Sequence, residues 1–131
     1  MVIMSSESET INVGELGLSV AELLRYLNLY GISGEYMNTA VGEISSDKAL
    51  VIFEAMENLV EKYIEKLKGV YVILSMQDNQ PIVKVTLENI SADSVESFEV
   101  LLGRAGVQML CEYEDEVGYF SFVPAEGGDE V

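Results

Sequence analysis

The pattern of hydrophobic and polar positions along the chain predicts two amphipathic helices in its first half. The first begins at a capping box formed by Ser19 and Glu22, and Gly31 ends it. Between the two helices, residues 32–44 alternate poorly between polar and apolar side chains, and we expect one or two strands there.

The second helix is the longer one, and it begins at a serine cap on Ser45 or Ser46 and ends before Gly69. Its apolar residues keep a period near 3.6, which is typical of a helix with one buried face. They are Leu50, Phe53, Met56, Val60, Ile64 and Leu67.

The second half of the chain favours strands. Residues 70–76 and 81–87 are rich in β-branched and apolar side chains, and the polar segment 77–80 between them predicts an antiparallel hairpin. Asp93 and Glu96 then form another capping box, which predicts a third helix.

A second hairpin is expected from residues 107–113 and 119–123, around an acidic turn that contains Gly118. Each helix needs a sheet face on which to bury its apolar stripe. The sequence therefore predicts an α/β (α+β) two-layer sandwich, with about three helices on one face of a mixed, mostly antiparallel sheet.

Composition and charge exclude several classes of protein. The 131 residues are 49% hydrophobic, which suits one domain, predicted at 16–128 between a flexible acidic segment 1–15 and a tail 129–131. With 23 acidic and 7 basic residues, the net charge of −16 should repel nucleic acids and anionic lipids. No apolar run approaches the roughly 20 residues of a membrane span, and no basic signal-peptide start is present, so we expect a cytoplasmic chain.

The inventory of reactive side chains is small. The chain has no histidine and a single cysteine, Cys111, which argues against zinc sites and against Cys/His or Ser/His catalysis. Cys111 lies in an alternating strand and is predicted to be a small buried hydrophobe. The two common nucleotide signatures, GxxxxGK[ST] and GxGxxG, are absent from the sequence.

Two i, i+4 pairs stand out on the predicted helices. Glu54 and Asn58 share one helix face, where they could orient a water and hold a hydrated cation. The same pair is also compatible with a solvated polar stripe that continues through Lys62. Tyr26 and Tyr30 are interpreted as core or interface aromatic residues.

The order of the elements and several short motifs resemble the catalytic ATP-binding domain of bacterial sensor histidine kinases, a branch of the GHKL or Bergerat-fold ATPases. The resemblance covers about residues 16 to 128. It rests on an entry helix at 18–27, an ExxxN motif at 54–58 similar to the N-box, a strand into the adenine site at 83–89, and closing segments at 103–106 and 122–128.

The resemblance implies roles for five residues and for ATP with Mg²⁺ as cofactors. Glu54 corresponds to the general base of the family and Asn58 to the magnesium ligand. Lys62 lies near the position of a basic residue that faces the nucleotide, and Glu88 or Asn89 corresponds to the adenine-reading aspartate.

The sequence also departs from the family pattern. Where the family has DxGxG, this chain has Glu88-Asn89-Ile90-Ser91-Ala92, so both glycines are missing. Side chains at such positions narrow the adenine pocket. Between Ser91 and the capping Asp93 there is no room for an ATP lid, and Glu61 would repel a triphosphate.

These departures lead to the hypothesis of a degenerate kinase-like domain in bacterial signal transduction, which lacks enzyme activity and works through protein binding. Because the chain has no phosphoacceptor histidine, its partner would be a histidine-bearing kinase domain, a response regulator or a similar protein. A homodimer is also compatible with the sequence. Two alternatives remain open: an active Mg-ATP-binding domain of a sensor kinase or kinase-like anti-sigma factor, and an unrelated small α/β dimerisation domain.

Overall fold

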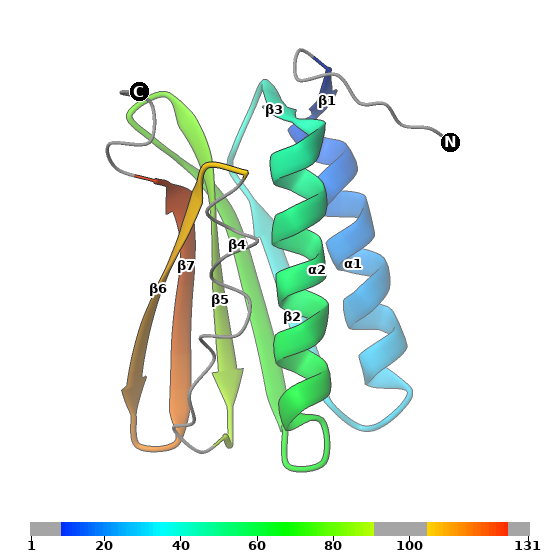
Figure 1. Ribbon diagram of the computed structural model, residues 1–131. Helices are drawn as coiled ribbons and strands as arrows, with labels where there is room; N and C mark the ends of the chain where they lie inside the picture. The colour runs from blue at the N-terminus through cyan, green and yellow to red at the C-terminus, as the bar shows by residue number, and fades with distance from the viewer. Residues whose placement is uncertain (1–8, 91–104, 126–131) are drawn as a thin grey trace.

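The computed structural model describes residues 9–90 and 105–125, whose helices and strands form two layers (Figure 1). In chain order the elements are β1 (Thr10–Asn12), α1 (Val13–Asn28), β2 (Ser33–Asn38), β3 (Glu43–Ser45), α2 (Ser46–Tyr63), β4 (Gly69–Gln77), β5 (Gln80–Glu88), β6 (Val107–Glu114) and β7 (Val117–Pro124).

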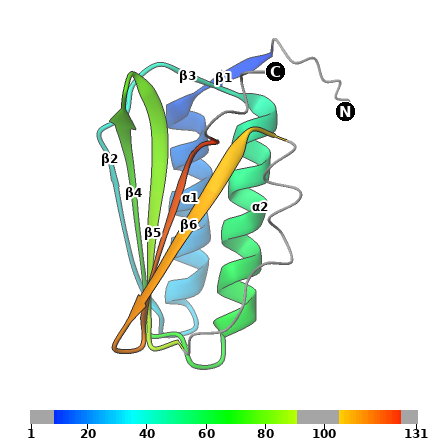
Figure 2. The ribbon, with the colours of Figure 1, turned by 60° about the vertical axis from the view of Figure 1, so that its left-hand side comes forward.

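Five strands form one mixed sheet in the order β2-β4-β5-β7-β6, while β1 and β3 form a separate two-stranded sheet. Only β2 and β4 pair in parallel within the large sheet, and its other three pairs are antiparallel. Figure 2 shows α1 and α2 together on one side of this sheet. The predicted mixed sheet with helices on one face is confirmed, and the described ranges contain two helices. The third helix, expected at 93–102, lies outside the described residues.

The core lies between the two helices and the facing side of the sheet. Val20 and Leu59 from the helices belong to the same hydrophobic cluster as Leu74, Leu87 and Phe122 from the sheet, and all five are 0% exposed. Truncating such a side chain to alanine typically costs about 2–5 kcal/mol. This shared core fixes the helices relative to the strands.

Helix α1 begins two turns earlier than the sequence predicts. The Asn12 side chain accepts a hydrogen bond of 2.8 Å from the amide of Gly14 and caps the helix, while Ser19 lies exposed in its interior. Val13 is buried, so the added turns cover more of the core and outweigh the local signal at Ser19. Residues 10–15, expected in the N-terminal segment, therefore form β1 and the start of α1.

Helix α2 begins where predicted, but its buried face is rotated from the predicted one. The Ser45 hydroxyl oxygen accepts a hydrogen bond of 3.2 Å from the amide of Lys48, which confirms the serine cap. Leu50 is 57% exposed and Ile64 is 37% exposed, whereas Leu59 faces the core. The helix also ends at Tyr63 rather than near residue 67. Neither described helix is both long and apolar enough to span a bilayer.

Two tight turns join the antiparallel pairs β4–β5 and β6–β7. Asp78 and Asn79 have φ values of 54° and 64°, and Asp115 and Glu116 have values of 53° and 68°. Left-handed conformations at both central residues define a type I′ turn, whose twist matches that of the flanking strands. Gly118, expected in the second turn, lies within β7 instead.

We expect Glu116→Gly to stabilise the fold by about 1 kcal/mol, because glycine adopts the left-handed region without the steric cost of an L-residue. The Glu116 carbonyl, which accepts from the amides of Asn89 and Ile90, is backbone and is retained. Urea unfolding followed by circular dichroism measures the change. The control Glu114→Gly, within β6, should lower stability by about 0.5–1 kcal/mol, and equal effects would contradict this role of the turn.

Candidate functional site

The outer face of α2 carries three of the predicted site residues. Glu54, Asn58 and Lys62 follow one another at four-residue intervals, and all three side chains are exposed. Ala55 and Met56 point to the core from the same helix, so α2 turns Glu54 outward. The structure therefore places these three residues together on an open surface.

Glu88, at the end of β5, lies on the other side of the sheet. The core cluster includes Val85 and Leu87, and side chains alternate along a strand, so Glu88 faces away from the helices. Its carboxylate accepts a hydrogen bond of 3.2 Å from the hydroxyl of Tyr71 on β4. The sheet thus separates Glu88 from Glu54 and Asn58.

The contact with Glu88 also changes the acidity of Tyr71. Partial burial is the main cause that raises the pKa of the Tyr71 hydroxyl above its ordinary value, and the negative charge of Glu88 and of Glu35 raises it further. The hydroxyl therefore stays protonated and remains a donor to the carboxylate over the whole neutral range.

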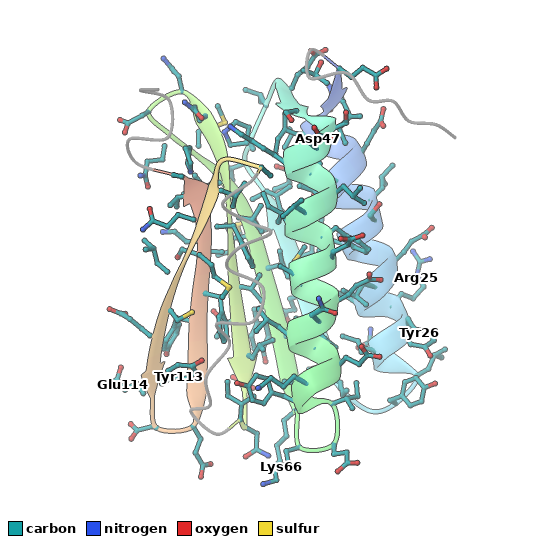
Figure 3. All side chains as sticks on the ribbon, in the orientation of Figure 1. Arg25, Tyr26, Asp47, Lys66, Tyr113 and Glu114 are labelled. Atoms are coloured by element: carbon teal, nitrogen blue, oxygen red, sulfur yellow. The ribbon has the colours of Figure 1, made fainter. Side chains whose placement is uncertain are left out.

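Asn89, which follows β5, forms hydrogen bonds to the loop after α2 and to the turn between β6 and β7. Its backbone has φ of 74°, and its side-chain amide donates a hydrogen bond of 2.6 Å to the carbonyl of Lys66, in the loop after α2. Figure 3 shows Lys66 at the end of the molecule where that loop lies. The amide nitrogen of Asn89 donates to the carbonyl of Glu116 at 3.0 Å. Asn89 thus links the α2–β4 loop to the β6–β7 turn.

Ile90 fills the space beyond the end of β5. It is 3% exposed, belongs to the hydrophobic core, and its amide also donates to the carbonyl of Glu116, at 2.9 Å. A Cβ atom on Gly118 would lie 2.6 Å from the Cδ1 atom of Ile90, so the isoleucine packs directly over this glycine. The position that the resemblance aligns with a motif glycine therefore carries a core side chain.

The residues predicted to bind the nucleotide do not lie together in the described part of the chain. Glu88 faces away from α2, the Asn89 side-chain amide is bonded to the carbonyl of Lys66, and Ile90 is a core residue packed against Gly118 of β7. In the two described ranges, no three His, Cys, Asp or Glu side chains gather as a metal site. In the described part of the chain, Asn89 and Ile90 lie beside the β6–β7 turn, whereas Glu54 and Asn58 lie on the exposed face of α2.

The sequence did not predict the groove that lies between α1 and α2. The groove has a volume of about 520 Å³, and its lining includes Tyr26, Tyr30, Asn58 and Ile64. The two tyrosine rings pack edge to face at 5.2 Å, and their hydroxyl oxygens lie 3.0 Å apart. Their i, i+4 spacing was a signal for an interface, but no pattern in the sequence showed that α2 contributes the opposite wall.

Comparison with known proteins shows similarity at the level of structure. No family model and no curated protein matches the chain. The fold is similar to the catalytic domain of histidine kinase ThkA, with a TM-score of 0.66 at 15% identity over 88% of this chain and 94% of that one. The ATP-binding domain of PrrB from Mycobacterium tuberculosis gives a TM-score of 0.64 at 12% identity, over 92% and 98% of the two chains.

A third similar structure is histidine kinase ThkA in complex with response regulator protein TrrA. Its TM-score is 0.59 at 16% identity, over 92% of this chain and 42% of that chain. The chain therefore has the fold of the catalytic ATP-binding domains of sensor histidine kinases, as its motifs predicted.

We expect Asn89→Ala to lower the free energy of unfolding by about 1–2 kcal/mol, since it removes the donor to Lys66 and leaves the carbonyl without that partner. Thermal unfolding measures the loss. Asn79→Ala is the matched control, because Asn79 also has a left-handed backbone, with φ of 64°. A loss at Asn79 as large as that at Asn89 would contradict a contribution from the Lys66 bond.

Proposed function

We propose that this chain is a degenerate histidine-kinase-type ATPase domain that acts in bacterial signal transduction by binding another protein. The observation that carries the proposal is Ile90, a core residue at a position where the family motif has glycine. A glycine there removes Cβ and leaves room beside the backbone, whereas isoleucine fills that room.

The environment of Ile90 supports the loss of nucleotide binding. The resemblance assigns Glu88 to the adenine end of the site, but Glu88 faces away from the helices, and its carboxylate accepts a hydrogen bond from Tyr71. Asn89 could supply an amide in its place only by giving up its hydrogen bond to Lys66. Binding a base here would therefore require breaking the Glu88–Tyr71 and Asn89–Lys66 hydrogen bonds and displacing the Ile90 side chain from the core.

The proposed partner follows from what the chain lacks for phosphotransfer. The sequence contains no histidine, so a phosphoacceptor histidine would have to come from another chain. The similar kinase ThkA forms a complex with a response regulator protein. We therefore propose a histidine-bearing kinase domain or a response regulator as the partner class, with the fold retained as a binding scaffold.

A second candidate is an active Mg-ATP-binding domain of a sensor kinase or of a kinase-like anti-sigma factor. The exposed row of Glu54, Asn58 and Lys62 favours it, because all three side chains are accessible on one helix face. In this candidate Glu54 is the general base, Asn58 holds magnesium and Asn89 or Glu88 reads the base. The idea of an unrelated dimerisation domain required a different fold, and the similarity to kinase domains removes its basis.

Calorimetric titration with ATP and with ADP, each with and without Mg²⁺, tests the proposed function. We expect no binding heat up to about 1 mM nucleotide, because the interior beside β5 is filled. The intact fold is checked in the same preparation by its unfolding transition. A dissociation constant near 1 μM, roughly −8 kcal/mol, would reject degeneracy in favour of the active domain.

Asn58→Ala separates the two candidate functions. If the domain is degenerate, the substitution leaves the nucleotide titration unchanged and stabilises α2 by about 0.5 kcal/mol, because alanine is the better helix former at an exposed position. If the domain is active, the substitution abolishes Mg-dependent nucleotide binding and gives the same small stabilisation of α2, so the nucleotide titration distinguishes the two functions. Glu65→Ala, in the exposed turn after α2, is the control that should leave both readouts unaltered.

A further inference from the structure

The groove between α1 and α2 has an apolar floor that the protein itself leaves partly open. Leu27 and Val60 form buried parts of its lining, while Tyr26, Tyr30 and Ile64 are 53%, 62% and 37% exposed. In Figure 3, Tyr26 projects from α1 on the side away from the sheet. Such a strip of exposed apolar side chains between two helices is typical of a surface that binds a third element.

The groove continues along the helices as a second section. This section has a volume of about 400 Å³, is lined by Phe53 and Glu22 among others, and shares Leu23, Tyr26 and Glu57 with the first section. We call both sections together the helical groove. From Phe53 to Ile64 the α2 wall is about 16 Å long at 1.5 Å per residue, which is three helical turns.

The charged side chains that line the helical groove are all acidic. Its lining contains Glu22, Glu57 and Glu61, and no lysine or arginine is among the described residues that line either section. The basic residues on the two helices, Arg25 and Lys62 among them, are outside both linings. An apolar floor with an acidic rim selects a ligand that is apolar along one side and basic along its margins.

Charge complementarity also decides between occupants. A second copy of this chain would bring another net charge of −16 to an acidic rim, which opposes association. The two ends of the chain, 1–8 and 126–131, contain glutamate and aspartate but no lysine or arginine, so neither complements the rim. A basic segment from another protein satisfies both the apolar floor and the acidic margins.

We propose that the helical groove is the docking surface for a basic amphipathic helix of a partner protein. The proposal rests on the proposed function as a partner-binding domain and names the surface and the chemistry of the partner. Apolar side chains of the incoming helix, spaced at i, i+3 or i+4 and i+7, lie between Tyr26, Tyr30 and Ile64. Its lysine or arginine residues lie beside Glu57 and Glu61.

The test uses a synthetic helical peptide of about 16 residues, with leucine at i, i+3, i+4 and i+7, lysine at the remaining positions and one tryptophan. Because the protein has no tryptophan, emission excited at wavelengths beyond the absorption of its tyrosines comes from the peptide alone and reports binding. A peptide with glutamate in place of lysine is the reversed-charge probe. We expect the basic peptide to bind, the acidic peptide to fail, and binding to weaken as salt is raised.

Charge reversal on the groove decides whether this binding is local. We expect Glu57→Lys with Glu61→Lys to weaken the basic peptide by at least about tenfold, a loss of about 1.4 kcal/mol. The matched control is Glu112→Lys with Glu114→Lys on β6, which gives the same net charge on the sheet. Figure 3 shows Glu114 on the opposite side of the molecule from α1. This control should change the dissociation constant by less than about twofold.

Apolar variants test the floor of the groove separately from its rim. We expect Ile64→Ser to weaken the basic peptide by about fivefold or more, since it shortens the apolar contact. Leu29→Ser is the matched control, because Leu29 is 80% exposed near the end of α1 and is outside the lining. Circular dichroism shows whether each variant keeps its fold. If Ile64→Ser does not fold, the charge-reversal variants still test the proposal.

Three outcomes overturn the proposal. The peptide fails to bind at about 1 mM, or the groove and control variants lose affinity equally, so that net charge alone attracts the peptide. The third outcome is a dimer in sedimentation that Ile64→Ser dissociates, which would assign the groove to a second copy. If the protein binds nucleotide and also binds the peptide at the groove, the degenerate function is rejected and the docking surface is retained. Failure of the proposed function can therefore be distinguished from failure of the docking surface.

Discussion

One face of the five-stranded sheet must be kept from water, and this requirement governs where both helices lie and how they are turned. It extends α1 back to Val13 and turns α2 so that Leu59 is completely buried. Because a helix contacts the sheet along one side only, covering the sheet uses only part of the apolar surface of each helix. The remainder lies between the helices as the lining of the helical groove.

The sequence predicts elements well where a local signal and the core agree. Ser45 caps α2 as expected, and the polar residues 77–80 lie at the first hairpin turn. It fails where the core overrides a local signal, as at Ser19, which has the spacing of a cap but lies inside α1. The phase of α2 is mispredicted for a related reason, since Leu50 and Ile64 are apolar and still exposed.

For the candidate site, the motif order predicted the fold, but the orientation of single side chains depends on strand register. Alternation along β5 puts Leu87 in the core and Glu88 on the opposite face. The left-handed backbone at Asn89 and its bond to Lys66 join segments far apart in sequence, and no periodic pattern encodes such a contact. Ile90 was recognisable as a departure, but its packing over Gly118 required the structure.

Among the strands that the structure describes, β2 lies at one edge of the large sheet, with β4 as its only neighbour there. An edge strand offers backbone donors and acceptors to a strand of another molecule, and short length with exposed charge opposes such addition. β2 has six residues and exposes Glu35, and the net charge of −16 opposes the approach of a second copy. That mutual repulsion vanishes near the isoelectric point of about 4.1, where edge-to-edge aggregation is opposed only by the shortness of β2.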